Sequence, residues 1–525
     1  MRAAGLRAVL SLLAALALPS LAAAAECRYD VTVIDASGSE LAVSIECDGG
    51  LPARLGMKTG AAGWVGTIRL SDGTQLETDL DGWSIPANKR ANTAQYRLDI
   101  AAMANASGRY NAALKVGDSV LVQFDSWLAV PEPAGDIELV ISIALPAGGN
   151  VATSLPRYPE GYRIAASELD RAGYFVFGSF KRADVTLPAP GALATGSGAT
   201  TQAHLIVLDQ GMKATTADLT RWVEFTGLAA AEFWRGFPMA DSFIVVVPES
   251  GQHIARGRVL PGASVTTILH VGRDMPAAKL YADSVLIHEM LHLGSPSIED
   301  KGDWLNEGVA TYYETIVRER AGWITREEVW REWLDLLPRG LDAMGPTGLE
   351  EADRNGIYWG GALFMLLADI ELRESSGLRQ GIEDCVRAVR DAGGTMDRDW
   401  TTKQFLDVCD RTYGNTIVSD LAARYLKPGE PPKLTVLWQR LGVSMAKDGT
   451  VGFNDAAPLA TVRDAILSGG PDAVWRPVPR PGAPPPEPME TRGSGAMRGT
   501  AFESPLPADA RCRTATRRSD NLDCD

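Results

Sequence analysis

The chain has 525 residues and a formal net charge of -15 at pH 7. This acidic surplus disfavours nucleic acid and anionic membrane surfaces as the main partners, because both repel negative charge. The length is enough for two or three domains, and no segment after the N-terminal region has an uninterrupted apolar stretch of membrane-spanning length.

Residues 1–25 have the pattern of a secretory signal peptide. Two arginines precede an apolar run that is broken at Pro19, and small residues follow. The run is too short to span a bilayer and no stop-transfer charges follow it, which disfavours a membrane anchor. A lipid anchor on Cys27 is disfavoured because Glu26 stands where the cleavage site needs a small residue. We therefore predict a cleaved signal and a soluble periplasmic or secreted protein.

Residues 26–160 consist of short alternating runs separated by turn residues. Runs such as YDVTVID, LAVSIEC and DIELVISIAL alternate apolar and polar residues, which is typical of half-buried strands. Gly, Asp, Asn and Pro separate the runs. This pattern predicts an N-terminal domain of the β-sandwich type.

Residues 161–467 are expected to form a second domain, in which strands and helices are mixed. AHLIVLD and DSFIVVVP predict buried strands, with a helix over residues 215–235 between them and another over residues 276–294. From there to residue 426, most segments carry apolar residues at helical spacing. We predict an α+β multidomain protein with an α-helical half packed on a mixed α/β half.

The helix expected over residues 276–294 contains the sequence HEMLH. His288 and His292 are one turn apart, so both imidazoles leave the same face of the helix, an arrangement that suits a zinc ion. Glu289 is rotated by about 100° from His288 and can take a proton from the attacking water without binding the metal. The alternative is a chance arrangement, which is rare in a chain with five histidines.

A catalytic zinc site generally needs a third protein ligand. The other histidines all lie upstream, so a carboxylate is required. Glu307, in the segment DWLNEGVATYYE, lies in the first turn of the next expected helix, and an antiparallel helix pair can bring it to the histidines. Asp300 and Asp303 are rival ligands. Without a metal-binding role, Glu307 would be a solvent-facing helix residue or a charge that interacts with the helix dipole.

Residues 468–525 are rich in Pro and Gly, which predicts a mostly disordered tail.

The six cysteines form three local groups along the chain. In an exported chain this predicts three disulfides, with free buried thiols as the alternative. The predicted pairs are Cys27–Cys47, Cys385–Cys409 and Cys512–Cys524.

HEMLH followed by WLNEGVATYYE resembles the gluzincin metallopeptidases, in particular the leucyl-aminopeptidase-like and glycyl aminopeptidase families. YWGGALFMLLADIELRESSGLRQGIEDCVRAV is similar to the tyrosine-containing helix of the glycyl aminopeptidase family, and FNDAAPLATVRDAI to its C-terminal region. The likeness extends over residues 27–467, although only the zinc motifs are specific. It implies a thermolysin-like catalytic domain, one Zn²⁺ per chain and a peptide or protein substrate.

The resemblance also implies residue roles. Glu307 would be the third zinc ligand, and Tyr358 would donate a hydrogen bond to the developing oxyanion, although by itself Tyr358 is an ordinary aromatic residue at a helix start. Separately from the resemblance, Thr311 lies one turn after Glu307 and is expected to support one of the metal ligands. Two features depart from the family pattern: the spacer between His292 and Glu307 is shorter, and the GxMEN motif that holds a free amine in leucyl-type enzymes is absent. An edge strand at residues 264–270 is the expected alternative for binding an extended peptide.

These observations predict an exported, zinc-dependent peptidase that is aminopeptidase-like by resemblance. Glu289 is its expected general base, and Tyr358 its expected oxyanion donor. Two other functions stay open. One is a non-catalytic binding or scaffold protein of the export compartment that retains the fold. The other is a zinc hydrolase that acts on non-peptide substrates.

Overall fold

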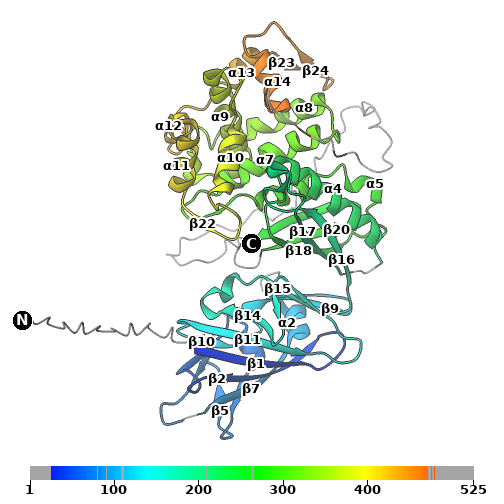
Figure 1. Ribbon diagram of the computed structural model, residues 1–525, viewed down its shortest axis with the longest axis vertical. Coiled ribbons are helices and arrows are strands. Elements are labelled where there is room, and N and C mark those ends of the chain that lie inside the picture. The colour runs from blue at the N-terminus through cyan, green and yellow to red at the C-terminus, as the bar shows by residue number, and fades with distance from the viewer. Residues whose placement is uncertain are drawn as a thin grey trace, which may run out of the picture.

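The structure is a computed structural model that describes residues 25–470, except residues 59, 80, 90, 108–111, 209–210 and 262–264, together with Trp475 and Val478. Residues 1–24 of the predicted signal peptide, most of the predicted tail and the Cys512–Cys524 pair lie outside the described residues, whereas Ala25, the last residue of the predicted signal, is the first residue of a strand. Figure 1 shows an N-terminal half made mainly of strands and a C-terminal half in which helices cover a second sheet. Within the described part of the chain, no helix combines the length and apolar character needed to cross a membrane.

The N-terminal half is organised around an eight-stranded sheet with two smaller sheets beside it. Inward-facing residues alternate with outward-facing ones along β1 and β2, as the period of two in the sequence predicts. The large sheet runs β13 (Arg157–Tyr158), β14 (Gly161–Ala165), β11 (Ile137–Ala144), β1 (Ala25–Val33), β2 (Glu40–Cys47), β7 (Thr93–Asp99), β4 (Thr67–Leu70), β5 (Gln75–Glu77). The smaller sheets run β10 (Val130–Glu132), β3 (Arg54–Gly56), β6 (Gly82–Ser84), and β12 (Val151–Thr153), β15 (Tyr174–Gly178), β9 (Ser119–Gln123), β8 (Ala113–Val116).

Strand pairing continues past residue 160, where the sequence placed the domain boundary. β14 pairs with β11 in the large sheet, and β15 pairs with β9 in a smaller one. The 3-10 helix η2 (Ala166–Arg171) lies between these two strands and contributes Ala166 and Leu169 to the core of the N-terminal half. Residues up to Gly178 therefore belong structurally to this half.

A five-stranded sheet connects the two halves. Its order is β16 (Lys181–Pro188), β17 (Thr200–Val207), β18 (Asp241–Glu249), β20 (Thr266–Gly272), β19 (Ile254–Leu260), and β17, β18 and β20 run parallel. One face is covered by α4 (Thr216–Trp234) and the helical half. The other face packs on the small sheet that contains β9 and β15, through residues such as Leu121, Val176 and Val245.

The edge strand of this sheet is not the one that the sequence predicted. Residues 266–270 of the segment expected as an edge strand lie in β20, which pairs with β18 on one side and β19 on the other. Every residue of β20 is buried, and a strand of that kind is stable only with neighbours on both sides. The edge is β19, whose sequence IARGRVL is more polar.

The helical half begins with a helix that the sequence predicted as one piece, over residues 276–294. The structure divides it into α5 (Ala277–Leu280) and α6 (Val285–His292). Before the second piece, the Asp283 carboxylate accepts a hydrogen bond from the Val285 backbone N–H, a local turn that precedes the first residue of α6. The remaining helices are α7 (Asp303–Arg320), α8 (Arg326–Leu336), α9 (Gly361–Ser376), α10 (Ile382–Asp391), α11 (Thr402–Tyr413), α12 (Ile417–Tyr425), α13 (Leu434–Leu441) and α14 (Ala460–Ser468).

Helices α7 and α9 pack backbone against backbone. A Cβ atom added to Gly361 would lie 2.1 Å from the Trp304 carbonyl oxygen and 2.8 Å from the Gly308 Cα, so only glycine permits this approach. The π-helical turn η5 (Gly356–Gly360) leads directly into α9. The close contact therefore brings η5 next to the beginning of α7.

Two of the three predicted disulfides are confirmed. Cys27 and Cys47 lie directly opposite each other on the paired strands β1 and β2. Cys385 and Cys409 join α10 to α11. Disulfides of this kind are typical of proteins that fold in an oxidising compartment.

Candidate metal centre

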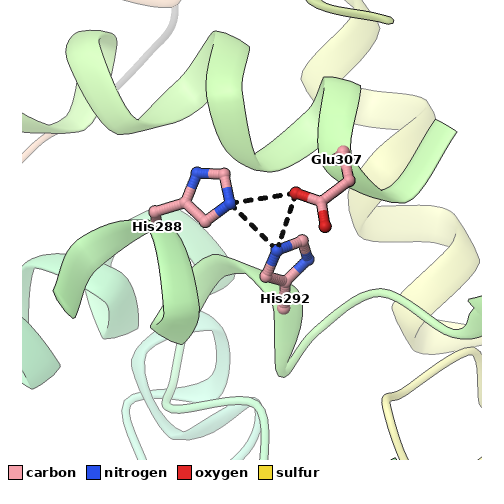
Figure 2. A group of neighbouring side chains, drawn as sticks. All are labelled: His288, His292 and Glu307. Carbon is pink, nitrogen blue, oxygen red and sulfur yellow. Dashed lines mark hydrogen bonds and ion pairs between the residues drawn. The ribbon is translucent and has the colours of Figure 1, made fainter. Parts of the chain in front are cut away.

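Three side chains from α6 and α7 converge on one point (Figure 2). His288 Nε2 lies 3.1 Å from His292 Nε2 and 3.1 Å from a carboxylate oxygen of Glu307. The same oxygen lies 3.3 Å from His292 Nε2. Among the residues that the structure describes, these three form the one group of His, Cys, Asp or Glu side chains whose donor atoms are close enough to share a metal ion.

The other ring nitrogen of each histidine is held by a neighbouring side chain. His288 Nδ1 lies 2.9 Å from a Glu314 carboxylate oxygen, and His292 Nδ1 lies 2.8 Å from the Asn306 amide oxygen. Both oxygens accept hydrogen bonds, so each Nδ1 carries the proton and donates it outward. Each Nε2 is then left with a lone pair that faces the Glu307 carboxylate.

This donor set fits a zinc ion. Two neutral imidazoles and one carboxylate are ligands that zinc binds in catalytic sites, and three protein ligands leave one position open. Without a cation or protons between them, the converging lone pairs and the carboxylate charge would repel one another. The outward hydrogen bonds from Nδ1 are the second layer of contacts that orients histidine ligands in metalloproteins.

His288, His292 and Glu307 shift one another's pKa values. Burial by itself lowers the pKa of His288, but hydrogen bonds and charge from Glu307 and Glu314 raise it well above its ordinary value. Burial likewise lowers the pKa of His292, and Glu307 outweighs that effect. Burial raises the pKa of Glu307, yet the two histidines bring it far below its ordinary value. These opposite shifts show that the point where the three side chains meet favours positive charge.

Glu289 is buried beside this cluster and lies against the edge strand β19. A Cβ atom added to Gly257 would lie 2.5 Å from Glu289 Cγ, so a side chain at position 257 would displace the glutamate. The carboxylate accepts a hydrogen bond from the Val259 backbone N–H. Burial raises the pKa of Glu289 above its ordinary value, although the two histidines oppose the shift. The strand thus fixes one proton-accepting carboxylate next to the three converging side chains.

Tyr358 lies in the π-helical turn η5 and contacts His288. Its ring is nearly parallel to the His288 ring, with 5.8 Å between the ring centroids, and its hydroxyl is hydrogen-bonded to Glu307. Burial, together with the negative charges of Glu307 and Glu289, raises the pKa of Tyr358 well above its ordinary value. The phenol therefore keeps its proton at neutral pH and can act as a hydrogen-bond donor. Interruptions of this π-helical type occur frequently at functional sites.

The rival carboxylates lie outside the converging group. Asp300 accepts hydrogen bonds from the backbone N–H and the hydroxyl of Thr402, both at 2.7 Å. Asp303 begins α7, one turn before Glu307, and is exposed to solvent. Thr311 is buried, but within the described residues its hydroxyl has no hydrogen-bond partner, so the expectation that it supports a metal ligand is wrong.

Sequence reasoning did not identify Asn306 and Glu314, the two residues that hold the histidines. Both share α7 with Glu307. Glu314 follows Glu307 by two helical turns, and that spacing is the signal that would have placed it on the same face of α7. Asn306 gives no comparable signal, because its contact with His292 depends on how α6 and α7 pack.

Comparison with known proteins supports the fold. No protein-family model matches the chain, and no curated protein sequence matches it significantly. Among solved structures, an aminopeptidase N family protein from Idiomarina loihiensis has a TM-score of 0.61 at 16% identity, with 80% of this chain and 79% of that chain covered. This likeness shows a shared fold.

Two further solved structures are similar at a lower level. An M1 zinc metallopeptidase from Deinococcus radiodurans, in a mutant form bound to a Tyr-Ser-Ala substrate, has a TM-score of 0.46 at 14% identity, covering 78% of this chain and 94% of that chain. Yeast LTA4 hydrolase has a TM-score of 0.46 at 16% identity, covering 79% of this chain and 70% of that chain.

Proposed function

We propose that this protein is an exported, zinc-dependent peptidase of the gluzincin type, with His288, His292 and Glu307 as the metal ligands. The observation that carries the proposal is the convergence of two Nε2 atoms and one carboxylate oxygen while both Nδ1 atoms donate outward. The fold shared with an aminopeptidase N family protein supports an aminopeptidase-like activity. The two disulfides and the signal-like N-terminal sequence support a periplasmic or secreted location.

The residues around the cluster suit the hydrolysis of a peptide bond. A bound zinc ion supplies a Lewis acid that polarises a carbonyl and acidifies water. Glu289, fixed by the Val259 N–H, accepts the proton of the attacking water and then delivers it to the leaving amine. Tyr358 keeps its proton at neutral pH and donates a hydrogen bond to the oxyanion that forms in the transition state.

The edge strand β19 is the proposed binding element for an extended substrate. It pairs with β20 along one edge only, so within the described sheet its other edge can form backbone hydrogen bonds with a peptide, apart from the Val259 N–H, which donates to Glu289. It also carries Gly257 and Val259, which contact Glu289. A peptide added to this strand would therefore lie beside the proposed general base.

We expect the protein to cleave a mixed peptide pool, to lose this activity after treatment with a chelator and to regain it when zinc is added. Mass spectrometry of the products checks this result and shows whether residues are released from free amino ends or bonds are cut internally. The absence of the GxMEN amine-binding motif favours one rival, a scaffold protein that retains the fold. Zinc bound without cleavage of any peptide would favour that rival over the peptidase.

We also expect zinc affinity to fall on acidification, starting above the ordinary histidine pKa of 6.5. The pKa values of His288 and His292 are raised, so the metal-free cluster takes up protons at a higher pH than free histidines do, and these protons compete with zinc. Zinc affinity is therefore highest at pH values above the raised histidine pKa values, and it declines as the pH falls through them. Competition with a chromophoric chelator between about pH 5 and 8 checks this prediction. An affinity that stays constant over that range would contradict it.

A further inference from the structure

The short spacer between His292 and Glu307 is attached to a segment about a hundred residues later in the chain. Within the spacer, β21 (Ser297–Ile298) pairs in parallel with β22 (Asp399–Trp400). The Ser297 N–H donates to the Arg398 carbonyl oxygen at 2.9 Å, and the Glu299 N–H donates to the Trp400 carbonyl oxygen at 3.1 Å. This pairing sets the position of the middle of the spacer.

Both ends of the spacer are attached to the same segment. The Met396 N–H donates to the Leu293 carbonyl oxygen at 3.3 Å, directly after α6. Near the other end, the Asp300 carboxylate accepts the two hydrogen bonds from Thr402. The loop that connects the two metal-binding helices therefore follows residues 396–402 along its length.

The segment that carries β22 is in turn bound to the N-terminal half. The Asp399 carboxylate forms a two-point ion pair with the Arg171 guanidinium, in which Nη2 lies 3.0 Å from Oδ1 and Nη1 contacts Oδ2. The side chains are 35% and 24% exposed, so water screens the pair only in part. Arg171 ends η2, which is anchored in the core of the N-terminal half through Ala166 and Leu169.

Asn306 connects the spacer to His292, one of the proposed ligands. The Asn306 side-chain amide donates to the Pro296 carbonyl oxygen at 3.3 Å, one residue before β21. The amide oxygen of Asn306 in turn accepts a hydrogen bond from His292 Nδ1. A shift of the spacer would therefore turn the Asn306 amide and change the direction of His292 Nε2.

We propose that the Arg171–Asp399 ion pair positions the metal centre, by holding the spacer so that Asn306 aligns His292. Both members of the pair are positioning residues, since neither belongs to the converging group. The inference rests on the proposed zinc site and goes beyond it, because it assigns the N-terminal β half a role in metal binding. A two-point arginine–carboxylate pair suits this role, since it fixes orientation as well as distance.

Zinc affinity and hydrogen exchange test this proposal with the full-length protein. In Arg171→Ala, we expect zinc affinity, measured by chelator competition, to fall by about tenfold, at the lower end of the loss seen for outer-shell partners of metal ligands. In the metal-free variant, we expect the amides of residues 293–302 to exchange faster than in the wild type. The exchanged-charge pair, Arg171→Asp with Asp399→Arg, should restore both quantities.

Arg163→Ala is the matched control. Arg163 forms ion pairs with Glu138 and Glu160 in the same half, and none of its ion pairs in the described part of the chain involves the spacer, so zinc affinity and exchange should stay at wild-type values. Arg171→Ala should also reduce zinc affinity less in an Asn306→Ala background than in the wild type, because both residues act on His292 through the same contacts.

Unchanged affinity and exchange in Arg171→Ala would overturn the positioning role, as would an equal loss in Arg163→Ala. Full additivity with Asn306→Ala would overturn the route through Asn306. A wild-type protein that binds no zinc would instead overturn the proposed function.

Discussion

Glu289→Gln is expected to reduce peptide hydrolysis by about 10²- to 10⁴-fold, the range that general acid–base catalysis contributes, while zinc stays bound. Glutamine has nearly the same shape, and its amide oxygen can still accept the Val259 N–H. It cannot take a proton from water, and it leaves the three converging donors untouched. The measurements are the turnover of a peptide found in the digest and the zinc content per chain.

Glu327→Gln is the control for this prediction. It makes the same chemical change at an exposed position of α8, so both turnover and zinc content should remain at wild-type levels. Undiminished turnover in Glu289→Gln would show that Glu289 is not the general base. Loss of zinc in that variant would instead show that Glu289 helps to hold the metal.

Glu307→Ala is expected to weaken zinc binding by more than the roughly 10- to 100-fold that follows loss of an outer-shell partner, and to remove hydrolysis with it. Only two imidazoles would remain, fewer than the three protein ligands of catalytic zinc sites. Tyr358 would also lose its hydrogen bond to Glu307. Chelator competition and the zinc-to-protein ratio measure the effect.

Asp303→Ala is the matched control, because it removes a carboxylate one turn earlier on the same helix. We expect its zinc affinity to remain close to that of the wild type, since Asp303 lies outside the converging group. If Asp303→Ala lost zinc while Glu307→Ala kept it, the assignment of the third ligand would be reversed.

The ordinary features of the chain were predictable because they are local. The period of two in YDVTVID corresponds to β1, and the apolar segments AHLIVLD and DSFIVVVP lie in the buried strands β17 and β18. The nearby cysteines of β1 and β2 pair as expected. Each of these features follows from side-chain spacing along a few residues, which backbone geometry translates directly into a buried face.

Other predictions failed where a local turn or a distant segment decides the result. The helix at residues 276–294 is interrupted by a turn in which the Asp283 carboxylate accepts a hydrogen bond from the Val285 N–H. In the five-stranded sheet, the edge strand next to β20 is β19. The pairing of β20 on both sides depends on the arrangement of the whole sheet. The supporting role expected of Thr311 belongs instead to Asn306 and Glu314.

The sequence by itself determined that His288 and His292 share a helix face and that Glu289 lies beside them, because 3.6 residues per turn impose this arrangement on any helix containing HEMLH. Only the tertiary structure decided which carboxylate meets them. Asp300 lies in the short loop between α6 and α7, and Asp303 and Glu307 lie in the first turns of the helix that follows it. The course of that loop is set by contacts with residues 396–402. Those contacts turn Asp300 toward Thr402 and leave Glu307 facing the two imidazoles.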